Sequence, residues 1–269
     1  MEFLILLIIG ILGGILAGTL GVGGGIIFTP VLLFLFQDST TDPVPWVIGT
    51  SLLCTFFAAL SSSYRQFAKH NLFLKESVKI GIGGLVGTII GRLITLSTWY
   101  NQEIFTVVFS SILIFTAIRF AIGKSNKVIN EDLSNDQSEL SLSAALLTGM
   151  SGGFLATIAG VGGGIVMVPI LTMFVGFSFM KSTSISSAVI VIISFFGWFQ
   201  FATAKANGES LSGFSLGFVD YGAALPLIIG TLAGAWIGVN INHKVKKRLL
   251  EIAFSILAFA VVTRLLSQL

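Results

Sequence analysis

The chain has 269 residues, of which 54% are hydrophobic and 10% are charged, with a formal net charge of +3 and a mean hydropathy of +0.97. Soluble domains carry about 25% charged residues, so this composition excludes a soluble protein and indicates one that crosses a membrane several times. The small net charge argues against nucleic acid as a partner, and the single cysteine, Cys54, excludes an intrachain disulfide and a multi-cysteine metal site.

Hydrophobic segments follow one another along the chain, at residues 3–36, 44–64, 78–98, 102–122, 141–180, 183–203, 214–240 and 249–266. One polar stretch, KSNKVINEDLSNDQSE at residues 124–139, interrupts them. Its charge and low apolar content predict a solvated linker, which we call the polar linker. It separates a first membrane repeat, residues 1–123, from a second, residues 140–269.

The first and fifth hydrophobic segments both contain GVGGG, at residues 21–25 and 160–164, each followed by a proline. A glycine costs about 1 kcal/mol inside a helix, so each run predicts a break. Two further landmarks recur. Thr50-Ser51 is followed 133 residues later by Thr183-Ser184, and Gly83, Gly87 and Gly91 are followed 147 residues later by Gly230, Gly234 and Gly238. We therefore predict that the two halves are structural repeats.

The lysine and arginine residues favour an inverted arrangement of these repeats. If segments 3–36 and 141–180 each enter the membrane and return to the same side, most basic residues fall on one side, as the positive-inside rule requires. A single crossing by every segment divides them more evenly. We expect an all-α polytopic membrane protein with two inverted repeats, each a glycine-broken helical hairpin followed by three transmembrane helices. Both termini are then expected outside.

The glycine breaks suggest a binding site for an anion. Each leads into a helix, and a glycine turn at a helix N-terminus presents backbone N–H groups and a partial positive charge. The alternative is that the glycines merely allow close helix packing, which is the role that we expect for the triplets at 83/87/91 and 230/234/238. The Thr-Ser pairs could add hydroxyl donors, or could serve as helix caps and back-bonding residues.

The candidate substrate-binding residues are Gly21, Gly23, Gly24, Gly25, Thr50, Ser51, Gly160, Gly162, Gly163, Gly164, Thr183 and Ser184. Arg92 is the charge deepest in a hydrophobic segment and is a candidate for gating, although its side chain could also reach the nearby interface. The sequence offers no candidate metal ligands and no motif for a cofactor. We also find no HExxH motif and no buried acid pair, so an enzyme is not expected.

The pattern GxGGGxxxxPxL at 21–32 and again at 160–171, together with Gly49-Thr50-Ser51-Leu52 and Ser182-Thr183-Ser184, resembles the TauE/SafE sulfite-exporter family, also called the toluene-sulfonate uptake permease family. The resemblance covers essentially the whole chain. It implies a multi-pass protein of the bacterial or archaeal inner membrane that transports sulfur-containing anions such as sulfite or sulfonates, and it favours export over import.

The sequence thus predicts a transporter of small sulfur-containing oxyanions, with the anion held at the paired GVGGG breaks near the middle of the bilayer. Access is expected to alternate as one repeat moves against the other. An anion channel with the same site and a membrane assembly factor without transport activity are the alternatives. The expected partners are a small anion and the lipid bilayer, with a homodimer left open and nucleic acid excluded.

Overall fold

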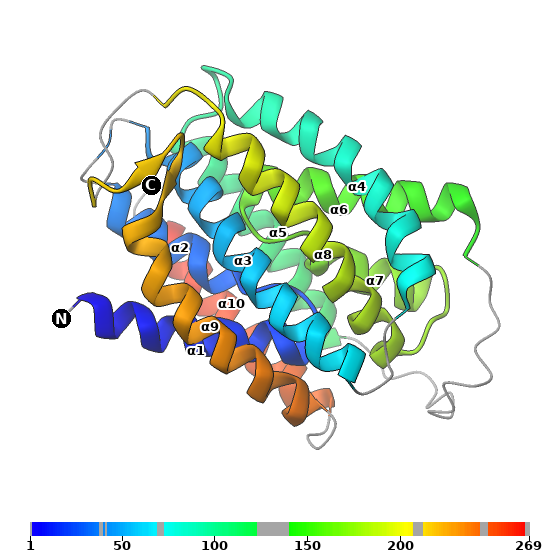
Figure 1. Ribbon diagram of the computed structural model, residues 1–269. Helices are drawn as coiled ribbons and strands as arrows, with labels where there is room; N and C mark the ends of the chain where they lie inside the picture. Colours follow the sequence, from blue (N-terminus) through cyan, green and yellow to red (C-terminus); the bar gives the residue numbers. More distant parts are fainter. Residues whose placement is uncertain are drawn as a thin grey trace.

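The structure is a computed structural model that describes residues 2–37, 40, 42–68, 73–122, 140–206, 212–242 and 247–266. The polar linker lies outside the described residues, so the predicted boundaries at 123 and 140 stay a prediction. Both halves of the chain are helical, and their helices follow the hydrophobic segments (Figure 1).

The first half contains α1 (Glu2–Leu20), α2 (Gly25–Phe36), α3 (Pro43–Ala68), α4 (Leu74–Thr95) and α5 (Gln102–Ile122). The second half contains α6 (Leu142–Ala159), α7 (Gly164–Met173), α8 (Phe179–Ala202), α9 (Tyr221–Asn242) and α10 (Lys247–Leu266). A short antiparallel hairpin of β1 (Ser215–Leu216) and β2 (Val219–Asp220) precedes α9. In the described part of the chain, 6 helices are long and apolar enough to cross a membrane: α1, α3, α4, α6, α8 and α9. The predicted all-α membrane fold is confirmed.

The chain doubles back at each glycine run. A Cβ placed on Gly13 of α1 would lie 2.6 Å from Cζ of Phe28 in α2, and one placed on Gly152 of α6 would lie 2.7 Å from Sδ of Met167 in α7. These contacts are incompatible with one straight crossing. With 12 and 10 residues, α2 and α7 are about 18 and 15 Å long at 1.5 Å per residue. Each is too short for a bilayer core of about 30 Å.

Helices of the first half pack against helices of the second half through glycine-lined contacts. The glycines of α9 pack on the backbone of α1, and those of α4 pack on the backbone of α6. A Cβ on Gly14 would lie 2.5 Å from the Thr231 carbonyl oxygen, and one on Gly83 would lie 2.8 Å from Cα of Leu146. Backbones approach this closely only where side chains are small. The packing role predicted for the glycine triplets is confirmed, with α1 against α9 and α4 against α6.

The central pair, α3 and α8, runs in opposite directions. Leu52, near the start of α3, contacts Gly197 near the end of α8, whereas Gln66 at the end of α3 donates a 3.3 Å hydrogen bond to Ser187 nearer the start of α8. These helices occupy equivalent positions in the two halves.

Each helix of this pair belongs to a group of helices that run in the same direction. α1, α3 and α9 run in one direction, and α4, α6 and α8 run in the other. The contacts that establish these directions pair residues in rising order on both helices: Gly10–Leu227, Gly18–Ala235, Cys54–Ala224, Arg65–Asn240, Gly83–Leu146, Gly91–Phe154, Gly84–Ile193 and Thr88–Gln200. Figure 1 shows α3 and α8 side by side in the middle, with α1 and α9 on one flank and α4 and α6 on the other.

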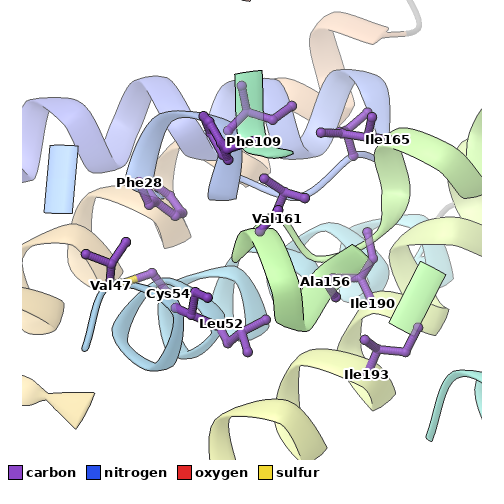
Figure 2. Close-up of a cluster of buried hydrophobic side chains, with 14 of the residues drawn as sticks. Phe28, Val47, Leu52, Cys54, Phe109, Ala156, Val161, Ile165, Ile190 and Ile193 are labelled. Carbon is purple, nitrogen blue, oxygen red and sulfur yellow. The ribbon is translucent and has the colours of Figure 1, made fainter. Parts of the chain in front are cut away.

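The core lies around α3 and α8. In their membrane-spanning stretches, 78% and 61% of the residues are buried, against 44% in α1 and in α4. Figure 2 shows part of it, with side chains from α2, α3, α5, α6, α7 and α8 around Val161 of the second glycine run. The outer helix faces carry exposed apolar side chains such as Leu12, Val86, Leu93 and Phe259. An apolar outer surface of this kind suits contact with lipid tails.

Candidate functional site

The glycine runs form two tight turns between helices, residues 21–24 before α2 and residues 160–163 before α7. Gly21, Gly23, Gly160 and Gly162 have φ angles of 63°, 83°, 68° and 75°, in the left-handed region that side chains disfavour. The turns differ at the fourth position, where φ is −75° for Gly24 and 78° for Gly163. The two turns therefore share a plan without being identical.

The two turns are in direct contact with each other. A Cβ placed on Gly164 would lie 2.5 Å from the Gly21 carbonyl oxygen, and one placed on Gly25 would lie 2.6 Å from Cα of Val161. Since these neighbours are backbone atoms, which cannot rotate away as a side chain can, only glycine permits this approach. All residues of both turns are buried. The sequence predicted that the paired breaks hold one anion between them, and the structure brings the two turns into contact.

Hydroxyl groups from the partner half hold each turn in place. Ser186 of α8 donates a 2.7 Å hydrogen bond to the Gly21 carbonyl, and Ser51 of α3 donates a 2.7 Å bond to the Gly160 carbonyl. Thr29 of α2 lies 3.0 Å from both the Gly160 carbonyl oxygen and the Ser51 hydroxyl. Ser51 therefore corresponds in function to Ser186, and not to Ser184 as the sequence shift suggested.

Beyond its first residue, each turn has backbone amides that find no hydrogen-bond acceptor within the described chain. Gly21 and Gly160 donate back to α1 and α6, and the helical ladders of α2 and α7 begin with bonds donated by Ile27 and Val166. Between these points, the N–H groups of residues 22–26 and 161–165 donate to no described residue. Buried amides are nearly always paired. Two sets of free donors, each at a helix N-terminus, are therefore a feature that a ligand would satisfy.

The other predicted site residues lie in several places. The Thr50 hydroxyl accepts a 3.1 Å hydrogen bond from the Asp220 amide, so it faces the β1–β2 hairpin. Thr183 packs its backbone against Gly21, while its hydroxyl donates to the Met180 carbonyl at 3.0 Å. Ser184 is buried in α8. Within the described residues, the Thr50 hydroxyl is bonded at the hairpin and not at either turn.

Arg92 lies in the last turn of α4. There its charge interacts favourably with the partial negative charge of the helix C-terminus. Three residues follow it in the helix, and no contact in the described chain connects it with the glycine turns. This location accords better with a role at the helix end than with one at the turns, and gating by Arg92 stays a prediction.

The end of α6, just before the second turn, is anchored by the α4–α5 connection. Thr95 donates a 3.0 Å hydrogen bond to the Thr157 carbonyl, and the Tyr100 hydroxyl donates a 2.7 Å bond to the Ile158 carbonyl. Burial raises the pKa of Tyr100, so its hydroxyl remains a donor at physiological pH. The carbonyl groups on this side of the turn are satisfied, in contrast to its amides.

Sequence reasoning missed several hydroxyl groups that line the turns. Thr29, Thr55, Ser186 and Ser194 all contact turn residues, and all four are buried. A usable signal existed for two of them. Thr55-Phe56-Phe57 and Ser194-Phe195-Phe196 lie 139 residues apart, the separation of the glycine runs themselves.

The chemistry of the turn contact is that of a neutral donor site. Its nearest polar groups in the described chain are backbone amides, backbone carbonyls and hydroxyls, which carry no net charge. Groups of ≥ 3 His, Cys, Asp or Glu side chains suited to a metal ion do not occur among the described residues. Such donors can bind oxygen atoms that carry negative charge without a buried cation.

The chain was compared with known proteins. The family model "Sulfite exporter TauE/SafE" matches residues 6–265. A "Probable membrane transporter protein" of Methanocaldococcus jannaschii is 32% identical over 94% of this chain and 93% of its own length. The "Probable membrane transporter protein YunE" of Bacillus subtilis is 28% identical over 100% of this chain and 98% of its own length. No solved structure matches the chain.

Both relatives carry the names of transporters and not of enzymes. Six helices able to cross a membrane accord with those names. Because the family model spans nearly all of the sequence, this multi-pass membrane protein belongs to the TauE/SafE sulfite exporter family of transporters.

Proposed function

We propose that the protein transports small sulfur-containing oxyanions, such as sulfite or organosulfonates, which bind where the two glycine turns meet. The observation that carries this proposal is the set of amides at residues 22–26 and 161–165 that donate to no described residue, although all the turn residues are buried. An oxyanion offers several acceptors at once. It would satisfy donors from both turns and interact favourably with the N-termini of α2 and α7.

An inverted-repeat transporter accounts for the helix directions. Transporters of this kind hold substrate at broken helices related by pseudo-twofold symmetry. Two observations support this arrangement. The helices α3 and α8 run in opposite directions, and the contact of α1 with α9 has a counterpart in the contact of α6 with α4. In the membrane, α1 would enter from the side opposite to α6, and the polar linker would lie in the cytoplasm.

The moving bodies would each contain helices from both repeats. Glycine-lined contacts join α1 to α9 and α4 to α6. A motion of one repeat as a unit would break both contacts at once. We therefore replace the motion expected from sequence with one in which α1, α3 and α9 move against α4, α6 and α8, with sliding between α3 and α8.

The buried state of the turns favours alternating access over a channel. A channel needs a continuous open path, whereas the residues of both turns are closed to solvent in this conformation. Export in preference to import rests on the name of the family that the chain matches. This preference concerns only the direction of net flux, and the proposed binding site is the same for export and import.

Flux in proteoliposomes tests the proposal. Purified protein is reconstituted with internal sulfite, and uptake of external labelled sulfite is followed with and without competing methanesulfonate. We expect saturable counterflow that methanesulfonate inhibits and that equal chloride does not. Uptake that rises linearly without counterflow would indicate a channel. Absence of both flux and thermal stabilisation by any oxyanion would indicate a protein without transport activity, such as an assembly factor.

A further inference from the structure

Two buried hydroxyl groups beside the glycine turns have no hydrogen-bond partner. Thr55 in α3 and Ser194 in α8 are both 0% exposed. The side-chain oxygen of each lacks a partner among the described residues. They come from the two central helices, one from each half of the chain.

Both residues lie near Gly162 of the second turn, and Thr55 also lies against Gly23 of the first turn. A Cβ placed on Gly23 would lie 3.0 Å from Cγ2 of Thr55, and one placed on Gly162 would lie 2.6 Å from the same Thr55 atom. The Ser194 hydroxyl oxygen lies 3.8 Å from that position on Gly162. Thr55 thus packs its methyl group against both turns, and the Ser194 hydroxyl lies near the second turn, in the region where the turns meet.

Two other buried hydroxyls of the same helices, in contrast, form hydrogen bonds within their helix. Serine and threonine in a helix commonly donate to the carbonyl one turn earlier. Ser62 of α3 does so to Ala58 at 2.9 Å, and Ser187 of α8 does so to Thr183 at 2.9 Å. An unsatisfied hydroxyl in a buried site costs free energy unless something else completes its hydrogen bonding.

The two positions recur in the sequence with the spacing of the glycine runs. The segments Thr55-Phe56-Phe57 and Ser194-Phe195-Phe196 are separated by the same 139 residues as the two GVGGG runs. Their surroundings in space differ, because the Thr55 methyl group lies against both Gly23 and Gly162, whereas the Ser194 hydroxyl lies near Gly162. Each central helix therefore contributes one unpaired hydroxyl residue to the region where the turns meet.

We propose that Thr55 and Ser194 bind the oxygen atoms of the substrate, and that the site takes singly charged oxyanions in preference to doubly charged ones. This inference rests on the proposed transport function. The free energy of removing an ion from water rises with the square of its charge, whereas attraction to neutral donors such as amides and hydroxyls rises in proportion to the charge. A site built from neutral donors therefore favours a sulfonate or hydrogen sulfite over sulfate or fully ionised sulfite.

Binding to the purified protein tests both parts. Methanesulfonate, which stays singly charged, and sulfate, which stays doubly charged at neutral pH, are titrated calorimetrically into wild type, Thr55→Val, Ser194→Ala and Ser62→Ala. We expect wild type to prefer methanesulfonate. Loss of a hydrogen bond to a charged group predicts that Thr55→Val and Ser194→Ala each raise its Kd about tenfold. Ser62→Ala removes a buried hydroxyl of α3 that is already bonded within the helix, and should leave the Kd unchanged.

Two further measurements keep the outcome decisive. Thr55→Ser retains the hydroxyl and should bind as wild type does, which separates hydrogen bonding from packing; if Thr55→Val does not fold, Ser194→Ala decides the result. Affinity for total sulfite should rise as the pH falls and hydrogen sulfite accumulates, while that for methanesulfonate stays constant.

The failures can be told apart. Wild-type affinity in both Thr55→Val and Ser194→Ala, or equal affinity of wild type for sulfate and methanesulfonate, would overturn this inference alone. Binding of neither anion nor sulfite by wild type, together with no flux, would overturn the proposed function itself.

Discussion

Replacing Ser186 with alanine should destabilise the protein more than replacing Ser51, although the two serines perform equivalent tasks. Ser186 is the hydroxyl donor to the Gly21 carbonyl within the described chain, at 2.7 Å. The Gly160 carbonyl instead has two candidate donors, Ser51 at 2.7 Å and Thr29 at 3.0 Å. The first turn therefore depends on one hydroxyl, and the second has a substitute.

The size of the difference follows from what each change leaves behind. Ser186→Ala leaves a buried carbonyl without its donor, which costs about 1–3 kcal/mol. Ser51→Ala allows Thr29, which is also 3.0 Å from the Ser51 hydroxyl, to donate wholly to the Gly160 carbonyl. The loss is then that of one ordinary hydrogen bond, about 0.5–1.5 kcal/mol. We expect a gap of about 1 kcal/mol, or about 2–4 °C in Tm for a chain of this size.

Thermal unfolding in detergent, followed by intrinsic tryptophan fluorescence, measures this gap. The double variant Thr29→Val/Ser51→Ala removes both donors to the Gly160 carbonyl and should approach the Tm of Ser186→Ala. A Tm for Ser51→Ala at or below that of Ser186→Ala would refute the reasoning. So would a double variant no less stable than Ser51→Ala alone, since Thr29 would then have no substituting role.

Gly164→Ala should lower stability by about 1–3 kcal/mol, because the new Cβ would lie 2.5 Å from the Gly21 carbonyl oxygen. Gly197→Ala is the control in the same unfolding assay and should stay within about 1 kcal/mol of wild type, because its nearest neighbour is a movable leucine side chain at 2.9 Å. Equal losses would contradict the contact between the turns. Tyr100→Phe should cost about 1–3 kcal/mol by leaving the Ile158 carbonyl unpaired. Because burial raises the pKa of Tyr100, its stabilising effect is complete below the ordinary value of about 10 and is lost as the pH rises further; unfolding curves of the phenylalanine variant that show the same alkaline loss would exclude this cause. Accessibility labelling should find a tag in the polar linker on the cytoplasmic face and a tag at the N-terminus on the opposite face, and labelling of both from one side would contradict the inverted arrangement.

Composition and repetition predicted the membrane fold, because both depend on features that recur along the chain. The glycine triplets predicted close packing through their spacing of four, which places them on one helix face. The segment at 3–36 could not be divided by hydropathy alone, since both legs of the hairpin are apolar. The glycine run at 21–25 located the break, and the structure shows α1 and α2 on either side of it.

The polar residues of the site were harder to predict, and Thr50 shows why. Thr50 and Ser51 are neighbours in α3, so about 100° separates their side chains around the helix. Both cannot face one point. Ser51 bonds the Gly160 carbonyl, whereas Thr50 bonds the Asp220 amide before α9. Of the two adjacent hydroxyls, one therefore contacts a turn. Which one it is depends on the orientation of α3 about its own axis, which the sequence does not specify.

Thr55 and Ser194 escaped prediction for a different reason. Single hydroxyl residues are common within apolar helices, where they bond the preceding turn, so their residue type carries little information. The helix leaves the oxygens of these two residues unpaired beside the glycine turns, and a sequence cannot display a missing bond.

The pairing of α1 with α9 also bears on how the protein is made. α1 is among the first helices to leave the ribosome, and its partner is among the last. During synthesis, the glycine-lined stripe of α1 must therefore contact lipid, or a temporary neighbour such as an insertase, until α9 is inserted. The first half of the chain alone would lack the surface against which α1 is built to pack, and a truncated product should be a substrate for membrane quality control.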